Sequence, residues 1–131
     1  MNFSELLAND DCNVFGIDWS ALESWTDYIA AAKTSLEVGT HVGKFVSKLA
    51  ILGLSSSNTH IIGHSLGAQA SGHLGREYIR GTGNKVGRIT GLDPAKPWFD
   101  FQDVGVKLSK NDAHFVDIIH TNSGSLLEVS V

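Results

Sequence analysis

The sequence predicts an α/β fold in which a mostly parallel sheet carries flanking helices. Short β-type runs alternate with two helical segments, and turn-forming residues separate them. Neither internal repeats nor low-complexity linkers interrupt this order. With 131 residues, of which 42% are hydrophobic, the chain is long enough to bury one modest core, so we expect a single domain.

We expect four strands and two helices. In chain order they are a strand at 13–17, a helix at 28–52, a strand at 59–62, a helix that begins at Leu66, and strands at 86–90 and 114–121. In the first helix, apolar residues recur with helical spacing and predict the buried face: Val38, Val42, Phe45, Val46 and Leu49. Gly39 and Gly43 each cost about 1 kcal/mol in a helix, and we expect close packing against the sheet to explain them.

Composition excludes several classes of protein. The net charge is −4 and no basic cluster is present, which argues against a nucleic-acid partner. The apolar stretches are shorter than the roughly 20 residues of a membrane-spanning helix, and the N-terminus shows no signal-peptide pattern. Cys12 is the single cysteine, so it either pairs outside this sequence or is a small buried hydrophobic residue.

A candidate nucleophile lies where the 59–62 run meets the following helix. Gly63, Ser65 and Gly67 form the pattern Gly-x-Ser-x-Gly between an apolar strand and a helix of small residues. This is typical of a nucleophile elbow, in which a tight turn exposes the serine hydroxyl and flanking glycines avoid collision with the returning helix. The alternative is a chance match in a loop, because the pattern fixes three positions in a glycine-rich chain.

Three longer motifs carry a family resemblance. They are Gly-His-Ser-Leu-Gly-Ala at 63–68, Gly-Arg-Ile-Thr-Gly-Leu-Asp-Pro-Ala at 87–95 and Asp-Ala-His-Phe-Val-Asp-Ile-Ile-His-Thr at 112–121. Together they resemble the pancreatic-lipase family, which are animal secreted lipases and phospholipase A1 enzymes with an α/β-hydrolase fold. The similarity covers most of the chain. It implies that residues 1–131 are an incomplete α/β-hydrolase domain that lacks the N-terminal strands, the lid and the C-terminal part.

The resemblance implies roles for several residues. Ser65 is the expected nucleophile, His64 flanks it in the elbow, and the backbone N–H of Leu66 is one expected oxyanion donor. Asp93 is the expected triad acid. Taken alone, Asp93-Pro94 is typical of a turn, but its position after an elbow serine favours the catalytic interpretation.

The catalytic histidine is expected outside this chain. In this fold class the triad follows the chain order Ser, Asp, His, and His120 is the better of the two histidines that follow Asp93. We assign neither as the base, because in the family the base lies beyond the lid. His41, His60 and His73 precede Asp93 and are expected to be structural or at the surface, whereas His114 lies in the 114–121 strand run and is given no role.

The family's structural calcium site would map to the carbonyls of Val104 and Lys107 and the side chains of Ser109 and Asp112. Ser109 stands where an acid is needed, and Ca²⁺ prefers charged oxygen ligands. We therefore expect no metal or other cofactor. Asp112 remains a weak calcium candidate, and a surface loop capped by its carboxylate is the favoured alternative.

The resemblance implies an extracellular carboxylic-ester hydrolase of lipids that acts at a lipid–water interface. The choice between triacylglycerol and phospholipid stays open, since the lid and neighbouring loops decide it. The alternatives are a non-catalytic lipid-binding relative of the egg-yolk type, which Ser65 disfavours, and a truncated inactive product. The chain alone is expected to be inactive.

Overall fold

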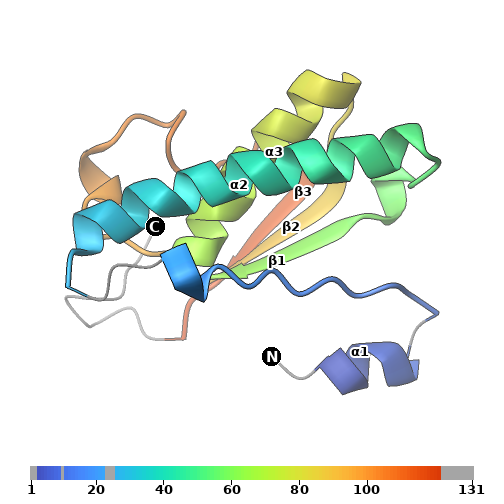
Figure 1. The fold of residues 1–131 in the computed structure, drawn as a ribbon, viewed down its shortest axis with the longest axis horizontal. Coiled ribbons are helices and arrows are strands. Elements are labelled where there is room, and N and C mark those ends of the chain that lie inside the picture. Colours follow the sequence, from blue (N-terminus) through green and yellow to red (C-terminus); the bar gives the residue numbers. More distant parts are fainter. Residues whose placement is uncertain (1–2, 10, 23–25, 122–131) are drawn as a thin grey trace.

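The three strands form one parallel sheet. The computed structural model describes residues 3–9, 11–22 and 26–121. Strands β1 (His60–His64), β2 (Val86–Leu92) and β3 (Ala113–Ile119) lie in the order β1-β2-β3, with Gly63 beside Gly91 (Figure 1). All strands point the same way, so their carboxyl ends share one edge. The predicted α/β fold is confirmed, and the strands at 59–62, 86–90 and 114–121 are found within two residues of their expected ends.

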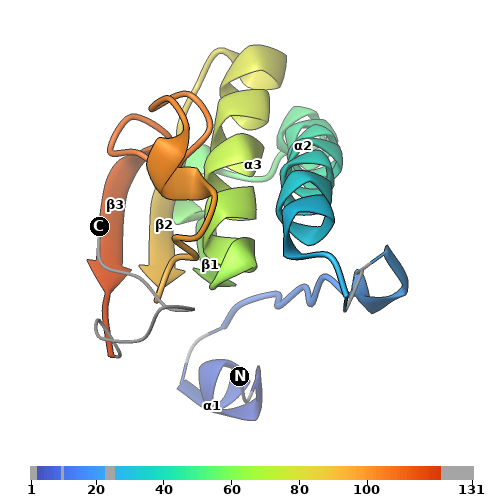
Figure 2. The same cartoon turned by 90° about the vertical axis from the view of Figure 1, so that its left-hand side faces the viewer.

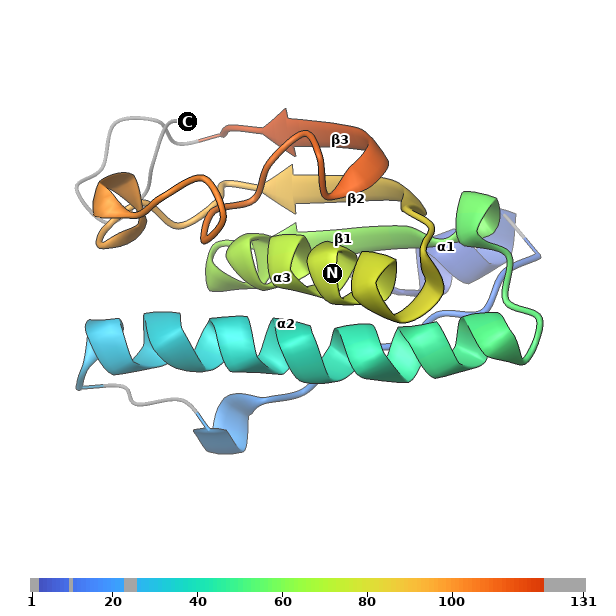
Figure 3. The same cartoon turned by 90° about the horizontal axis from the view of Figure 1, so that it is seen from above.

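Both long helices lie on one side of the sheet. Helix α3 (Leu66–Thr82) packs on β1 and β2, and helix α2 (Tyr28–Ile51) packs on the outer side of α3 (Figures 2 and 3). A short helix, α1 (Phe3–Asn9), was not expected from the sequence. Three single 3₁₀ turns complete the described elements: η1 (Ser20–Leu22), η2 (Ser56–Asn58) and η3 (Phe99–Phe101). Within the described ranges no helix has the length and apolarity needed to cross a membrane.

Helix α2 buries its small residues rather than the predicted apolar face. The buried side is a stripe of Ala31, Ala32, Ser35, Gly39, Gly43 and Ser47. A Cβ at Gly39 would lie 2.2 Å from the carbonyl oxygen of Ala70, and one at Gly43 would lie 2.7 Å from the Cβ of Glu77. The glycines therefore permit close contact with α3, not with the sheet. The predicted face is wrong in this respect: it is partly buried at most, and Phe45 is 46% exposed.

The strand expected at 13–17 is also wrong. These residues are described, but they form no ladder with β1, β2 or β3. A β-type run becomes a strand only when a neighbour supplies backbone partners. Here Phe15 instead packs edge-to-face against Phe45 of α2, with the ring centroids 6.3 Å apart. Cys12, at the start of this segment, is exposed, which contradicts one of its two alternatives, that of a buried small residue.

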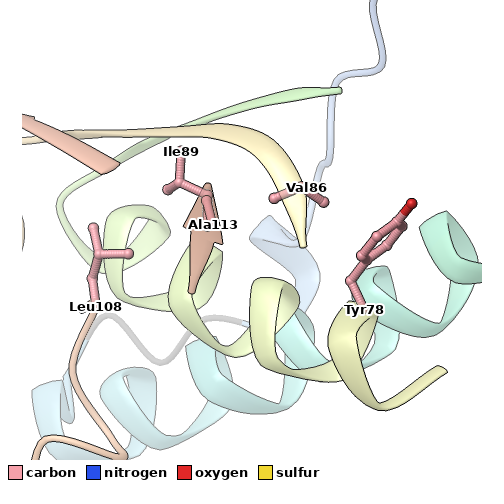
Figure 4. Packing of buried hydrophobic residues seen from close by; sticks show 5 residues of the cluster. All are labelled: Tyr78, Val86, Ile89, Leu108 and Ala113. Carbon is pink, nitrogen blue, oxygen red and sulfur yellow. The ribbon is translucent and has the colours of Figure 1, made fainter. Parts of the chain in front are cut away.

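The core lies between α3 and the sheet. Tyr78, Val86, Ile89, Leu108 and Ala113 pack together, so the loop before β3 is held by Leu108 (Figure 4). A second cluster joins Ala32 of α2 to Ala95 and Phe99, which follow β2. Phe99 is 1% exposed, and burial of such a side chain contributes about 1.5–3 kcal/mol. Both ends of the long loop between β2 and β3 are thereby fixed to the core, and this loop begins at Asp93.

Candidate active site

Ser65 occupies a strained turn between β1 and α3. Its backbone has φ 54° and ψ −119°, a conformation that residues other than glycine rarely adopt. The turn is held because the Ser65 N–H donates to the carbonyl of Leu92 on the neighbouring strand, at 2.9 Å. The Ser65 side chain makes no capping hydrogen bond to α3. Strand, strained serine and helix thus follow one another as a nucleophile elbow requires.

The two elbow glycines differ in their surroundings. A Cβ at Gly63 would lie 2.2 Å from the carbonyl oxygen of Gly67 and 2.5 Å from the hydroxyl of Ser71, so the position excludes any side chain. At Gly67, a Cβ would meet no neighbouring atom within 4 Å among the described residues. The expectation that both glycines avoid the returning helix is therefore wrong for Gly67.

The start of α3 supplies a candidate anion site. Leu66 is the first residue of this helix, so its N–H has no partner within the helix. The positive end of the helix macrodipole lies at the same place. His64, the last residue of β1, is exposed.

Asp93 follows β2 directly and is buried beside the end of β3. Its residue exposure is 8%, and its backbone also has a positive φ, of 40°. The Asp93 N–H donates to the carbonyl of Ile119 at 2.8 Å. Its carboxylate accepts two hydrogen bonds from Thr121: from the backbone N–H to Oδ1 at 2.6 Å and from the hydroxyl to Oδ2 at 2.5 Å. Sequence analysis missed Thr121, because no local pattern marks a residue that acts across strands.

The loop after Asp93 is tied to the elbow by a buried glutamine. The N–H of Ala95 donates to the carbonyl of Ser65 at 3.2 Å. Gln69 of α3 donates from Nε2 to the carbonyl of Ala95 at 2.7 Å, and its Oε1 accepts from the N–H of Leu108 at 2.9 Å. One side chain therefore fixes both ends of the loop relative to Ser65. The sequence carried no signal for Gln69 beyond a polar residue in a run of small ones.

Helix α2 holds the same loop from the other side. The Tyr28 hydroxyl donates to the carbonyl of Pro97 at 3.0 Å. Burial, aided by the negative charge of Asp100, raises the pKa of Tyr28 to about 12. The phenol therefore keeps its proton, and this hydrogen bond, across the physiological pH range.

His120, which follows β3, lies close to Asp93. Its Nδ1 lies 3.9 Å from Asp93 Oδ1, which is beyond hydrogen-bonding distance. Other histidines have structural contacts elsewhere. His60 Nε2 is 2.8 Å from the Thr90 hydroxyl, and His73 Nε2 is 3.1 Å from the carbonyl of Val106. Burial is the main cause that lowers the pKa of both imidazoles.

The calcium candidate does not fit a cation, because two of its four ligand groups, the Lys107 carbonyl and the Asp112 carboxylate, already accept hydrogen bonds from an arginine. Arg76 Nη1 donates to both carboxylate oxygens of Asp112, at 2.9 and 2.8 Å, and to the carbonyl of Lys107 at 3.1 Å. The N–H of Ser109 donates to Asp112 Oδ2 at 2.8 Å, as the capped-loop alternative expected. The Asp112 side chain is nevertheless buried, at 3% exposure, rather than at the surface, and burial raises its pKa against the opposing effect of Arg76. Among the described residues no group of three or more His, Cys, Asp or Glu residues is placed to hold a metal.

Comparison with known proteins identifies the family of this chain. The family model described as Lipase matches residues 2–131. The chain is 43% identical to pancreatic lipase-related protein 2 of Bos taurus over 116 residues, which are 88% of this chain and 24% of that protein. It is 43% identical to human pancreatic triacylglycerol lipase over 119 residues, with 90% and 24% covered, and 39% identical to human phospholipase A1 member A over 121 residues, with 92% and 25% covered. The chain thus spans about a quarter of the length of these relatives, and it belongs to the lipase family, with part of that family's α/β-hydrolase fold.

Proposed function

We propose that the protein carrying this chain is a carboxylic-ester hydrolase of lipids, of the triacylglycerol lipase or phospholipase A1 type. The observation that carries the proposal is the pairing of Ser65 and Asp93. Ser65 lies on a strained turn at the carboxyl end of β1, and Asp93 follows the adjacent strand β2. Relatives named as lipases and as phospholipase A1 support the same chemistry.

In the proposed reaction, Ser65 Oγ attacks the ester carbonyl carbon while a histidine takes the hydroxyl proton. The Leu66 N–H, together with a second N–H from outside this chain, stabilises the oxyanion that forms. The histidine then gives its proton to the departing alcohol. Water, activated by the same histidine, cleaves the acyl-enzyme and releases the fatty acid. Asp93 orients this histidine and stabilises its charged form.

The histidine is proposed to lie outside this chain, in the part of the domain that residues 1–131 do not cover. The chain covers only about a quarter of the length of each relative, which supports this proposal. The outer edges of the sheet support it as well. Within the described residues β1 and β3 each pair with β2 alone, so both have an edge at which further strands of a larger domain can add. We further propose an extracellular protein that meets its substrate at a lipid–water interface.

No cofactor is part of this proposal. The calcium candidate does not fit, because Arg76 supplies the positive charge to which the Asp112 carboxylate and the Lys107 carbonyl bind. An internal guanidinium thus orders the loop before β3 in place of a metal ion.

The test is a comparison of Ser65→Ala and Asp93→Asn in the complete protein. Ester hydrolysis and labelling by a fluorophosphonate probe are expected to be lost in Ser65→Ala, since removal of a triad serine costs a factor of about a million in turnover. Asp93→Asn is expected to keep the fold and lose most activity. Ser47→Ala is a matched control, because its hydroxyl donates a hydrogen bond to the carbonyl of Gly43 within α2. If Ser65→Ala kept a tenth of the activity, the assignment would be wrong, and lipid binding without turnover in the unmodified protein would indicate a non-catalytic relative.

A further inference from the structure

Thr121 donates two hydrogen bonds to the carboxylate of Asp93. Its backbone N–H lies 2.6 Å from Oδ1 and its hydroxyl lies 2.5 Å from Oδ2, so Thr121 donates one hydrogen bond to each oxygen. Hydrogen bonds to an ionised acceptor are the shorter and stronger kind, and two of them from one residue fix the plane of the carboxylate. The side chain of Asp93 is 10% exposed, so solvent contributes little to holding it.

The backbone of Asp93 does not supply this orientation unaided. Its φ of 40° is a conformation that a residue with a side chain rarely adopts, and it persists only when neighbouring groups hold it. Those neighbours are at the end of β3: the carbonyl of Ile119 accepts from the Asp93 N–H at 2.8 Å, and Thr121 follows two residues later. The strand end thus holds Asp93 at three points, one on the backbone and two on the carboxylate.

We propose that Thr121 is the positioning residue of the triad acid, an inference that rests on the proposed function. In the proposed triad the same carboxylate accepts the Nδ1–H of the catalytic histidine, so its orientation decides how well that hydrogen bond forms. With its plane fixed, the carboxylate meets the histidine in one geometry throughout the reaction. In this role Thr121 acts on the reaction through Asp93, whose carboxylate it contacts directly.

The proposal predicts a specific pattern in the kinetics of the complete protein. Thr121→Val keeps the β-branched shape and the backbone N–H but removes the hydroxyl donor. Loss of a hydrogen bond to a charged group is expected to lower kcat about 10- to 100-fold with KM unchanged, and to slow fluorophosphonate labelling of Ser65 to the same extent. Thr121→Ser restores the hydroxyl and is expected to return kcat to within about threefold of the unmodified protein.

A matched control separates positioning from stability. Thr40 also uses its hydroxyl in a local hydrogen bond, to the carbonyl of Leu36 at 3.0 Å, and it lies in α2, away from Asp93. Thr40→Val is therefore expected to leave kcat and labelling unchanged. If Thr121→Val does not fold, Thr121→Ala gives the same comparison against Thr121→Ser.

The outcomes distinguish this inference from the proposed function. If Ser65→Ala abolishes turnover while Thr121→Val stays within twofold of the unmodified protein, Thr121 has no positioning role and the inference is overturned. The same holds if the serine variant is as slow as the valine variant, or if Thr121→Val raises KM and leaves kcat unchanged. If Ser65→Ala retains turnover, the proposed function itself fails.

Discussion

Removal of the Arg76 guanidinium is expected to lower the free energy of unfolding, because it leaves the buried Asp112 carboxylate without its positively charged partner. Arg76→Met keeps much of the aliphatic length but removes three hydrogen bonds of Nη1, two to Asp112 and one to the carbonyl of Lys107. The side chains are 23% and 3% exposed, so water replaces the lost partner poorly. Breaking a buried ion pair at one partner costs about 3–5 kcal/mol, and we expect the free energy of unfolding at pH 8 to fall by that amount.

The loss is expected to depend on pH in a defined direction. Burial already raises the pKa of Asp112, and Arg76 opposes that rise. Without Arg76 the folded-state pKa rises further above the unfolded value of about 3.9, so the folded protein binds the proton more tightly than the unfolded chain does. Stability of the variant is then fully retained below pH 4 and declines as the pH rises through the folded-state pKa. The difference from the unmodified protein is therefore smaller at pH 5 than at pH 8.

Denaturant unfolding of the complete protein at pH 5 and pH 8 measures both quantities. The double variant Arg76→Met/Asp112→Asn is the control, because the neutral amide still accepts the N–H of Ser109 and no charge is stranded. It is expected to recover at least half of the loss at pH 8. A loss below about 1 kcal/mol in Arg76→Met, or the same loss at both pH values, would refute the reasoning.

Four further outcomes follow from contacts elsewhere in the structure. Gly63→Ala is expected to disrupt the elbow and abolish activity, because its Cβ would lie 2.2 Å from a backbone oxygen. Gly67→Ala is expected to be neutral or to stabilise α3 by up to about 1 kcal/mol. Circular dichroism melts of both variants measure the change in stability, and an ester-hydrolysis assay measures the change in activity. The Arg88 guanidinium is the main cause that lowers the pKa of Asp117 to about 2. This ion pair is expected to contribute at most about 1 kcal/mol to the free energy of unfolding above pH 4, and the contribution is lost as the pH falls from 4 to 2. In Asp117→Asn the free energy of unfolding should change less with pH over that range. Chelation of calcium is expected to leave the melting temperature unchanged, and a drop of several degrees would show that a metal binds after all. The isolated 131-residue chain is expected to aggregate through the outer edges of β1 and β3, which pair with no further strand among the described residues, and to hydrolyse no nitrophenyl ester. Turnover that disappeared in both Ser65→Ala and His120→Ala would instead make His120 the base.

Local patterns in the sequence were sufficient for the elements that depend on neighbours along the chain. Around Ser65 an apolar run predicts the strand, small residues predict the turn, and the residues that follow predict the helix. An apolar run likewise predicts β2. Helix α2 was expected at 28–52 and is found at Tyr28–Ile51. Motifs at 63–68 and 87–95 also identified the family, which the comparisons confirm.

Features that depend on contacts between distant segments required the tertiary structure. The apolar run at 13–17 looked like a strand, but pairing needs a neighbour's backbone and none of the described strands provides it. The face of α2 was chosen by apolarity, whereas the backbone of α3 approaches so closely at Gly39 that small residues are buried instead. For the same reason the sequence by itself determined the residue types of the candidate site, Ser65 and Asp93, while only the fold decided what holds them. Thr121 is 28 residues from Asp93 along the chain, and their hydrogen bonds exist because β2 and β3 run in parallel and end at the same edge.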